Sequence, residues 1–112
     1  MSKIVPTSEI LFRLEALLHQ RKNAAAGSSY VASLYAKGLD AVLKKVGEEA
    51  TEAILAAKGD DKTHLTKEAA DLIFHTLVML AAKDVALADV LAELERREGM
   101  SGLSEKKSRQ DL

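Results

Sequence analysis

The sequence predicts an all-α protein, a bundle of four main helices. In four long segments the apolar side chains recur three or four residues apart, which is the period of an amphipathic helix. No segment shows the strict alternation typical of a half-buried strand. The segments are bounded by glycine, aspartate or the single proline, which favour turns and helix ends. We therefore expect one all-α domain over residues 1–99 and a charged tail over residues 100–112.

The first predicted helix begins after Pro6 and ends near Lys22. Ser8 is its expected N-cap, because a serine hydroxyl accepts a hydrogen bond from one of the unpaired N–H groups at a helix start. Residues 23–29 are small and polar and predict a loop, and residues 30–35 predict a short helical turn. The apolar stripe of the first helix consists of Ile10, Leu11, Leu14, Leu17 and Leu18.

The second long helix is predicted within residues 38–59. At about 100° per residue, Glu48, Glu49 and Glu52 lie within roughly a 100° arc of this helix. Lys45 falls inside the same arc, so this face carries charge while the opposite face packs. The packing face consists of Leu39, Val42, Leu43, Val46, Ala50, Ala53, Ile54 and Ala57.

The third predicted helix, residues 65–82, has almost no polar face, so we expect it to be largely buried. A tight turn with one glycine and two aspartates precedes it, which predicts that the second and third helices run antiparallel. This arrangement places Glu68 and Asp71 opposite Glu49 and Glu52. Because a buried carboxylate without a partner costs several kcal/mol, these acids require positive charge.

The last predicted helix follows Lys83 and ends near Arg97, with Gly99 as the expected C-cap. Four helices, one of them nearly all apolar, are more hydrophobic than a single small bundle requires. We therefore expect a homodimer in which helix faces are buried between two chains.

The five carboxylates on the facing helices predict a metal site. Gathered into one cluster, they would repel one another strongly unless a cation lay among them. Oxygen-only ligands select hard ions such as Mg2+ or Mn2+, and Mg2+ binds through a few carboxylates together with substrate phosphates. We expect one or two Mg2+ ions, with Mn2+ as a substitute, and a phosphate ester or anhydride as substrate. The predicted metal ligands are Glu49, Glu52, Glu68 and Asp71.

Four side chains near these ligands have alternative roles. Glu48 is either a further ligand or the catalytic general base that takes a proton from the attacking water. Lys45 either contacts a substrate phosphate or forms an ion pair one turn along its helix. His75 is either a group of the metal site or a hydrogen-bonded core histidine, and Tyr30 either binds the substrate or serves only in packing.

The composition argues against several other functions. With no cysteine there is no disulfide framework and no thiolate chemistry. A net charge of -1 and 4% aromatic residues provide no basic stripe, so we expect no nucleic-acid partner. No apolar run approaches the roughly 18 residues needed to span a bilayer, and no apolar leader follows Met1. We therefore expect a cytoplasmic protein without a membrane partner.

Two other functional classes remain open. A di-iron carboxylate bundle requires Glu-x-x-His pairs, and the chain contains none. A non-enzymatic helical dimerisation module would carry the same acids as a solvated surface.

Residues 45–52 and 68–71 together resemble the EExxE…ExxD signature of the all-α nucleotide pyrophosphohydrolases related to MazG. Residues 29–34 and 101–109 are similar to the corresponding parts of the phosphoribosyl-ATP pyrophosphatases of histidine biosynthesis. The resemblance therefore covers nearly the whole chain.

This resemblance implies Mg2+-dependent hydrolysis of phosphoribosyl-ATP at the α–β phosphoanhydride. The products are phosphoribosyl-AMP and pyrophosphate, and the reaction is the second step of histidine biosynthesis. The resemblance also implies a MazG-like homodimeric helical bundle and a small-molecule nucleotide substrate. A general house-cleaning nucleoside triphosphate pyrophosphatase is the nearest alternative within the same class.

Overall fold

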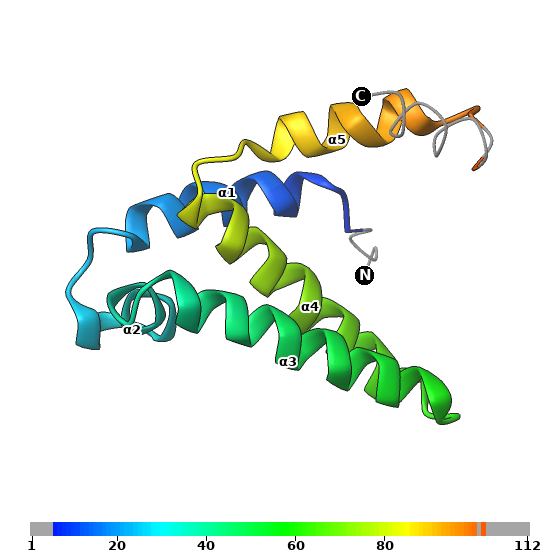
Figure 1. Ribbon diagram of the computed structural model, residues 1–112, viewed down its shortest axis with the longest axis horizontal. Coiled ribbons are helices and arrows are strands. Elements are labelled where there is room, and N and C mark those ends of the chain that lie inside the picture. Colours follow the sequence, from blue (N-terminus) through cyan, green and yellow to red (C-terminus); the bar gives the residue numbers. More distant parts are fainter. Residues whose placement is uncertain (1–5, 101, 103–112) are drawn as a thin grey trace, which may run out of the picture.

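Five α-helices form the computed structural model, which describes residues 6–100 and 102 (Figure 1). The four long helices match the four expected from the sequence, and the seven-residue α2 occupies the segment expected as a short helical turn. No strand occurs in the described part of the chain, so the all-α prediction is confirmed. The helices are α1 (Glu9–Arg21), α2 (Tyr30–Ala36), α3 (Leu39–Lys58), α4 (Lys62–Ala82) and α5 (Leu87–Arg97), with a 3-10 turn at Ala26–Ser28.

The antiparallel hairpin of α3 and α4 is the framework of the molecule, and these two helices share the most extensive interface. The connection between them is short because Asp61 begins α4 immediately. The Asp61 carboxylate accepts hydrogen bonds from the backbone N–H groups of Thr63 at 3.0 Å and His64 at 3.1 Å. This cap satisfies two unpaired donors, and it explains why α4 starts three residues before the expected Leu65.

The remaining helices pack around one end of this hairpin. Helix α1 lies against α4, α2 against α3, and α5 returns along α1 (Figure 1). The core is therefore at the C-terminal half of α4, where Leu18, Val42 and Val78 are completely or almost completely buried. The whole buried apolar cluster consists of Leu18, Val31, Leu34, Val42, Leu77, Val78, Ala81 and Leu87.

The other end of the hairpin extends beyond α1, α2 and α5 (Figure 1). Ile54 and Leu55, near the C-terminal end of α3, are 63% and 62% exposed, and Ile73, at the middle of α4, is 51% exposed. The prediction that residues 65–82 are largely buried is wrong for residues 65–73, all of which are exposed or half-buried, because the described helices α1, α2 and α5 pack around the other end of the hairpin. The Cα radius of gyration of 16.6 Å exceeds the value of about 13 Å for a compact domain of 100 residues, in keeping with this extended hairpin.

The helix ends follow local backbone chemistry. Ser29 caps α2 by accepting a hydrogen bond from the Ala32 N–H at 3.0 Å. Ser8 occupies the N-cap position of α1, but its side chain makes no capping hydrogen bond, since its own backbone is already helical. Gly99 has a φ of 84° and follows the C-cap residue Glu98 of α5, so it supplies the left-handed residue that commonly ends a helix.

Two contacts connect α1 to the elements beyond α4. The Lys22 amino group donates to the Ala81 carbonyl and to the Asp84 carboxylate, both at 2.8 Å, and this hydrogen bond holds the pKa of Asp84 below its ordinary value. Glu15 accepts a hydrogen bond from the Leu87 N–H at 2.8 Å. Because Ala86 offers no capping side chain, Glu15 of α1 acts as the N-cap of α5.

None of the described helices combines the length and the apolar character needed to cross a membrane. Most of the predicted tail, residues 101 and 103–112, lies outside the described residues.

Replacing Glu15 with alanine is expected to lower the free energy of unfolding by about 1 kcal/mol, the usual loss for an N-cap. The matched control is Gln20→Ala, an exposed position on the same helix, for which we expect a change within about 0.5 kcal/mol. Urea denaturation followed by circular dichroism measures both variants. Equal stability of the two variants would contradict the capping role of Glu15.

Candidate metal and substrate site

Three of the four predicted metal ligands meet between α3 and α4. Glu49, Glu68 and Asp71 each contribute a carboxylate oxygen, and these three oxygens all lie within 4.8 Å of one another. Glu49 is buried, Glu68 is half-buried and Asp71 is exposed. The cluster therefore runs from the helix interface to the surface, and a solute can reach it from one side.

The helix geometry explains why these acids converge. Glu68 and Asp71 are three residues apart on α4, so they project from the same face of that helix. Because α3 runs antiparallel to α4, the middle of α3 lies opposite this face and presents Glu49 to it. The three acids are therefore held by regular backbone on two helices rather than by loops.

The protein balances the charges of this cluster only in part: Lys45 lies 3.2 Å from Glu49 Oε1, and His64 lies 3.5 Å from Glu68 Oε1. Glu49 Oε2 and Glu68 Oε2 are buried and have no hydrogen-bond partner among the described residues. A buried polar atom without a partner costs about 1–3 kcal/mol, and more when it is charged. Unpaired oxygens on converging carboxylates are what a hard divalent cation binds, so the residues present fit such an ion.

Glu52, the fourth predicted ligand, lies at the edge of the cluster. It is not among the three residues whose oxygens converge. The negative charge of Glu49, followed by a hydrogen bond with Glu68, raises the pKa of Glu52 above its ordinary value. A raised carboxyl pKa caused by neighbouring carboxylates marks an excess of negative charge, so Glu52 faces the same unbalanced charge as the three clustered acids.

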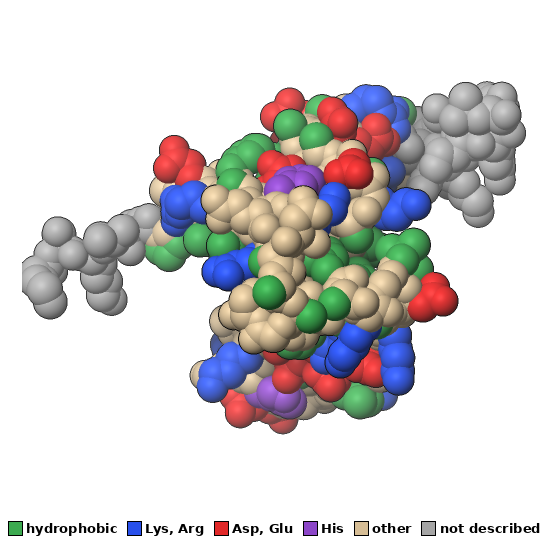
Figure 2. Space-filling model, turned by 90° about the vertical axis from the view of Figure 1, so that its left-hand side faces the viewer, with side chains coloured by type: hydrophobic (Ala, Val, Ile, Leu, Met, Phe, Trp, Pro, Cys, Tyr) green, Lys and Arg blue, Asp and Glu red, His purple; other side chains and the backbone are tan. Residues whose placement is uncertain are grey.

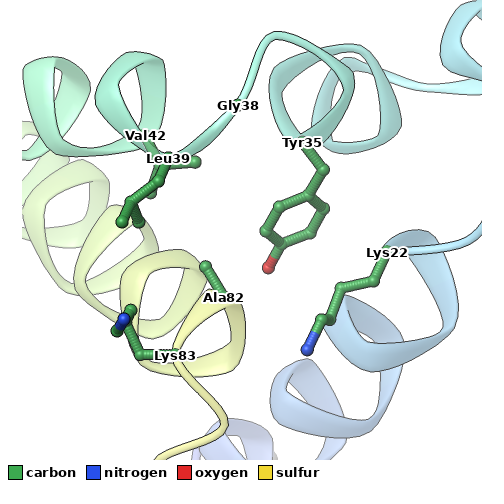
Figure 3. A pocket seen from close by; sticks show the side chains of 7 residues that line it. All are labelled: Lys22, Tyr35, Gly38, Leu39, Val42, Ala82 and Lys83. Atoms are coloured by element: carbon green, nitrogen blue, oxygen red, sulfur yellow. The ribbon is translucent and has the colours of Figure 1, made fainter.

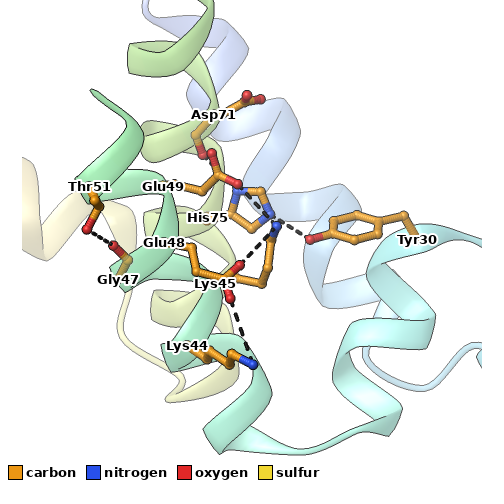
Figure 4. A network of polar contacts seen from close by, with 9 residues as sticks. All are labelled: Tyr30, Lys44, Lys45, Gly47, Glu48, Glu49, Thr51, Asp71 and His75. Carbon is orange, nitrogen blue, oxygen red and sulfur yellow. Dashed lines mark hydrogen bonds and ion pairs between the residues drawn. The ribbon is translucent and has the colours of Figure 1, made fainter. Parts of the chain in front are cut away.

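Glu48, the predicted catalytic residue, turns away from the cluster (Figure 4). Its carboxylate lies 3.6 Å from the amino group of Lys45 and 3.9 Å from that of Lys44. Glu48 and Glu49 are neighbours in the chain, but their side chains leave the helix about 100° apart. Glu48 therefore lies near lysines, whereas Glu49 lies near the other carboxylates. Glu48 therefore belongs to a group of lysines beside the carboxylate cluster.

Lys45 joins these two groups of charges. Its amino group lies 3.2 Å from Glu49 Oε1 and 3.6 Å from Glu48 Oε2, which is the ion pair one turn along the helix that the sequence left open. The hydrogen bond to Glu49 raises the pKa of Lys45. Lys45 thus holds one oxygen of Glu49 and leaves the other, Oε2, buried without a partner among the described residues.

His75 connects the cluster to Tyr30, a link that sequence reasoning missed. His75 Nδ1 lies 2.8 Å from the Asp71 carbonyl, and Nε2 lies 2.8 Å from the Tyr30 hydroxyl. A carbonyl can only accept, so Nδ1 carries a proton, and in the neutral imidazole Nε2 then accepts from the Tyr30 hydroxyl. With both nitrogens engaged, His75 is a buried, hydrogen-bonded residue and not a metal ligand.

Tyr30 is held at the edge of the site by this hydrogen bond. Its ring packs edge-on to the His75 ring with centroids 5.8 Å apart, yet the side chain is 53% exposed. Partial burial, the main cause, raises the pKa of the Tyr30 hydroxyl. The ring is therefore fixed in orientation while one part of it remains open to a ligand.

Two cavities lie near α3, and the smaller one is linked to the carboxylate cluster through Lys45, which lines it and contacts Glu49. The larger, about 270 Å³, lies at the start of α3 and is lined by Lys22, Tyr35, Gly38, Leu39, Val42, Ala82 and Lys83 (Figure 3). None of the clustered acids lines it. The smaller, about 230 Å³, is lined by Leu34, Lys37, Ala41, Lys44, Lys45 and Glu48, and it shares Lys45 with the metal site.

The fold and site together define an all-α protein with a carboxylate cluster, whose residues fit a hard cation, between the two helices of a hairpin. Residues 11–98 match the model of the phosphoribosyl-ATP pyrophosphohydrolase family, and the chain belongs to this family. It is 60% identical to the phosphoribosyl-ATP pyrophosphatase of Dinoroseobacter shibae over 89% of this chain and 98% of that protein. It is 57% identical to the enzyme of the same name from Novosphingobium aromaticivorans over 90% of this chain and 94% of that protein.

The hydrogen bonds of His75 predict a single neutral tautomer, with the proton on Nδ1. Nitrogen chemical shifts from a long-range 1H–15N correlation spectrum are expected to show a protonated Nδ1 and an unprotonated Nε2. In Tyr30→Phe the Nε2 resonance is expected to move while Nδ1 keeps its proton, because the Asp71 carbonyl is unchanged. A protonated Nε2 in the wild type would contradict this assignment.

Proposed function

We propose that this chain hydrolyses phosphoribosyl-ATP to phosphoribosyl-AMP and pyrophosphate, the second step of histidine biosynthesis. Water attacks one phosphorus of the α–β anhydride, and the bridging oxygen leaves with the other phosphate. The observation that carries the proposal is the carboxylate cluster of Glu49, Glu68 and Asp71, with two buried oxygens that lack a partner. Membership of the phosphoribosyl-ATP pyrophosphohydrolase family supports the choice of substrate.

Glu49, Glu68 and Asp71 would hold one or two Mg2+ ions, with Glu52 as a further ligand and Mn2+ as a substitute. The all-oxygen donor set supports a hard ion. A bound ion supplies neutralising charge for the phosphate oxygens and lowers the pKa of a coordinated water. Glu52 is included because its raised pKa places it within the same excess of negative charge.

The other residues of the site bind and orient the substrate. Lys45 carries a positive charge at the edge of the cluster and would contact a phosphate oxygen. Glu48 is directed away from the cluster, toward Lys44 and Lys45, so to act as the general base that takes the proton of the attacking water its side chain would have to rotate toward the cluster. The exposed ring of Tyr30, fixed by His75, would pack against the base or ribose of the nucleotide.

The direct test is to incubate the purified protein with phosphoribosyl-ATP, and separately with ATP and deoxynucleoside triphosphates, with and without Mg2+. Pyrophosphate release that requires Mg2+ and occurs with phosphoribosyl-ATP is the expected result. Release mainly from the ordinary nucleotides would instead support a house-cleaning nucleotide pyrophosphatase. No release from any of these substrates would overturn the proposal.

Removing the charge of one metal ligand is expected to abolish the stabilisation of the folded protein by Mg2+. Mg2+ at 100 times its dissociation constant should stabilise the wild type by about 2.7 kcal/mol. Glu49→Gln and Asp71→Asn should lose this stabilisation and at least about 100-fold in activity, while their melting temperatures without metal stay equal to or exceed that of the wild type because repulsion is relieved. Thermal melts with and without Mg2+ measure the stabilisation of each variant.

Glu95→Gln on α5 is the matched control. A Glu49→Gln protein that Mg2+ still stabilises would contradict the ligand assignment.

We also propose that the chain forms a homodimer through the part of the α3–α4 hairpin that the described helices α1, α2 and α5 leave uncovered (Figure 1). The support is the exposure of Ile54, Leu55 and Ile73 on two neighbouring helices. Large apolar side chains gathered on an exposed surface are typical of interaction sites. A second copy presents the same apolar hairpin, and a two-fold interface buries both together.

Analytical ultracentrifugation is expected to give twice the 12.1 kDa mass of the chain. Ile73→Lys should shift the protein toward the monomer, because a lysine ammonium is costly to bury in an apolar interface. Gln20→Lys introduces the same charge on α1, away from the hairpin, and should leave the dimer intact. A dimer unaffected by Ile73→Lys would place the interface elsewhere.

A further inference from the structure

The cavity between α2 and α3 is strongly basic. Three of its six lining residues are lysines, and Glu48 is its only acid. The whole chain has a net charge of -1, so this is a local concentration of positive charge beside the most acidic part of the molecule. Figure 2, which views the molecule from the side of α2, shows lysine and arginine side chains lying beside acidic ones on the lower part of this face.

Two of the three lysines form no close ion pair with a described residue. Lys45 forms the short ion pair with Glu49. Lys44 lies 3.9 Å from Glu48 with its side chain 78% exposed, and an exposed pair at this distance contributes little. Lys37 forms no ion pair with any described residue. Lys37 and Lys44 therefore present ammonium groups to the cavity whose charge is available to a ligand.

The cavity and the carboxylate cluster are adjacent compartments of one site. Lys45 lines the cavity and also contacts Glu49, so a ligand that fills the cavity ends beside the proposed metal ligands (Figure 4). The cluster takes up phosphate only through a cation, whereas the lysines attract phosphate directly. The site therefore offers two separate places for phosphate.

Phosphoribosyl-ATP has phosphate at two separate places, and ATP does not. Besides its triphosphate it carries a phosphomonoester on the second ribose. We propose that Lys37 and Lys44 bind this phosphomonoester while the triphosphate lies at the carboxylate cluster, so that the cavity selects phosphoribosyl-ATP over ATP. This inference rests on the proposed function and assigns the specificity of that same site. The competing occupant of the cavity is the β,γ end of the triphosphate.

The test compares binding of the two nucleotides in Lys37→Gln, Lys44→Gln and the double variant. For each protein we would measure the KM for phosphoribosyl-ATP and the inhibition constant of ATP, at fixed Mg2+. Each substitution is expected to raise the KM for phosphoribosyl-ATP about tenfold, the usual size of a lost charged hydrogen bond. The kcat and the inhibition constant of ATP should stay within twofold of the wild type. Lys58→Gln, at the exposed end of α3, is the matched control.

The outcomes distinguish a failure of the lysine assignment from a failure of the proposed function. An equal rise of the KM for phosphoribosyl-ATP and the inhibition constant of ATP would overturn the proposal, since the lysines would then bind the triphosphate. Unchanged constants in the double variant would overturn it as well. A wild type that cleaves ATP but not phosphoribosyl-ATP would instead refute the proposed function.

A second measurement does not depend on turnover. Ribose 5-phosphate carries the same phosphomonoester without the base or triphosphate. In a metal-free 1H–15N titration it is expected to shift the backbone resonances of residues 37 and 44 in the wild type and in Lys58→Gln, but not in the double variant. Shifts of equal size in the double variant would show that the cavity lysines do not bind it.

Discussion

The repulsion among carboxylates between α3 and α4 is the constraint on which the functional part of this structure depends. Glu49, Glu68 and Asp71 converge, and two of their buried oxygens lack a partner. Such an arrangement opposes folding unless other contacts hold the helices together or a cation neutralises it. The short turn capped by Asp61 and the core around Val78 provide the first; the proposed Mg2+ provides the second.

The apolar core and the acidic site lie in different parts of the molecule. The apolar core lies at the end of the hairpin that α1, α2 and α5 surround, so stability is concentrated away from the acids. Helix α2 serves both purposes, because Leu34 packs in the core while Tyr30 and Lys37 face the site. The described parts of α1, α2 and α5 do not cover the opposite end of the hairpin, so under the proposed dimer a second copy completes the structure around the acids.

The sequence predicted the helices correctly because they depend on local chemistry. Helical periodicity, the Asp61 cap and the left-handed Gly99 involve neighbouring residues only. The sequence could not decide which acids meet, because Glu48 and Glu49 are separated by a single rotation of the helix and face lysines and carboxylates respectively. It also missed contacts between distant residues, such as the bond of His75 to Tyr30, 45 positions apart. The burial of α4 was overestimated because an apolar pattern alone does not reveal which of its side chains other helices cover.

A crystal structure of the protein grown with Mn2+ tests whether the carboxylate cluster binds a divalent cation. Anomalous scattering locates this ion without reference to activity. An anomalous peak is expected between α3 and α4, within about 2.0–2.3 Å of oxygens from Glu49, Glu68 and Asp71. A fully ordered cluster with no peak at millimolar Mn2+, or a peak on other residues alone, would show that the cluster is not a cation site.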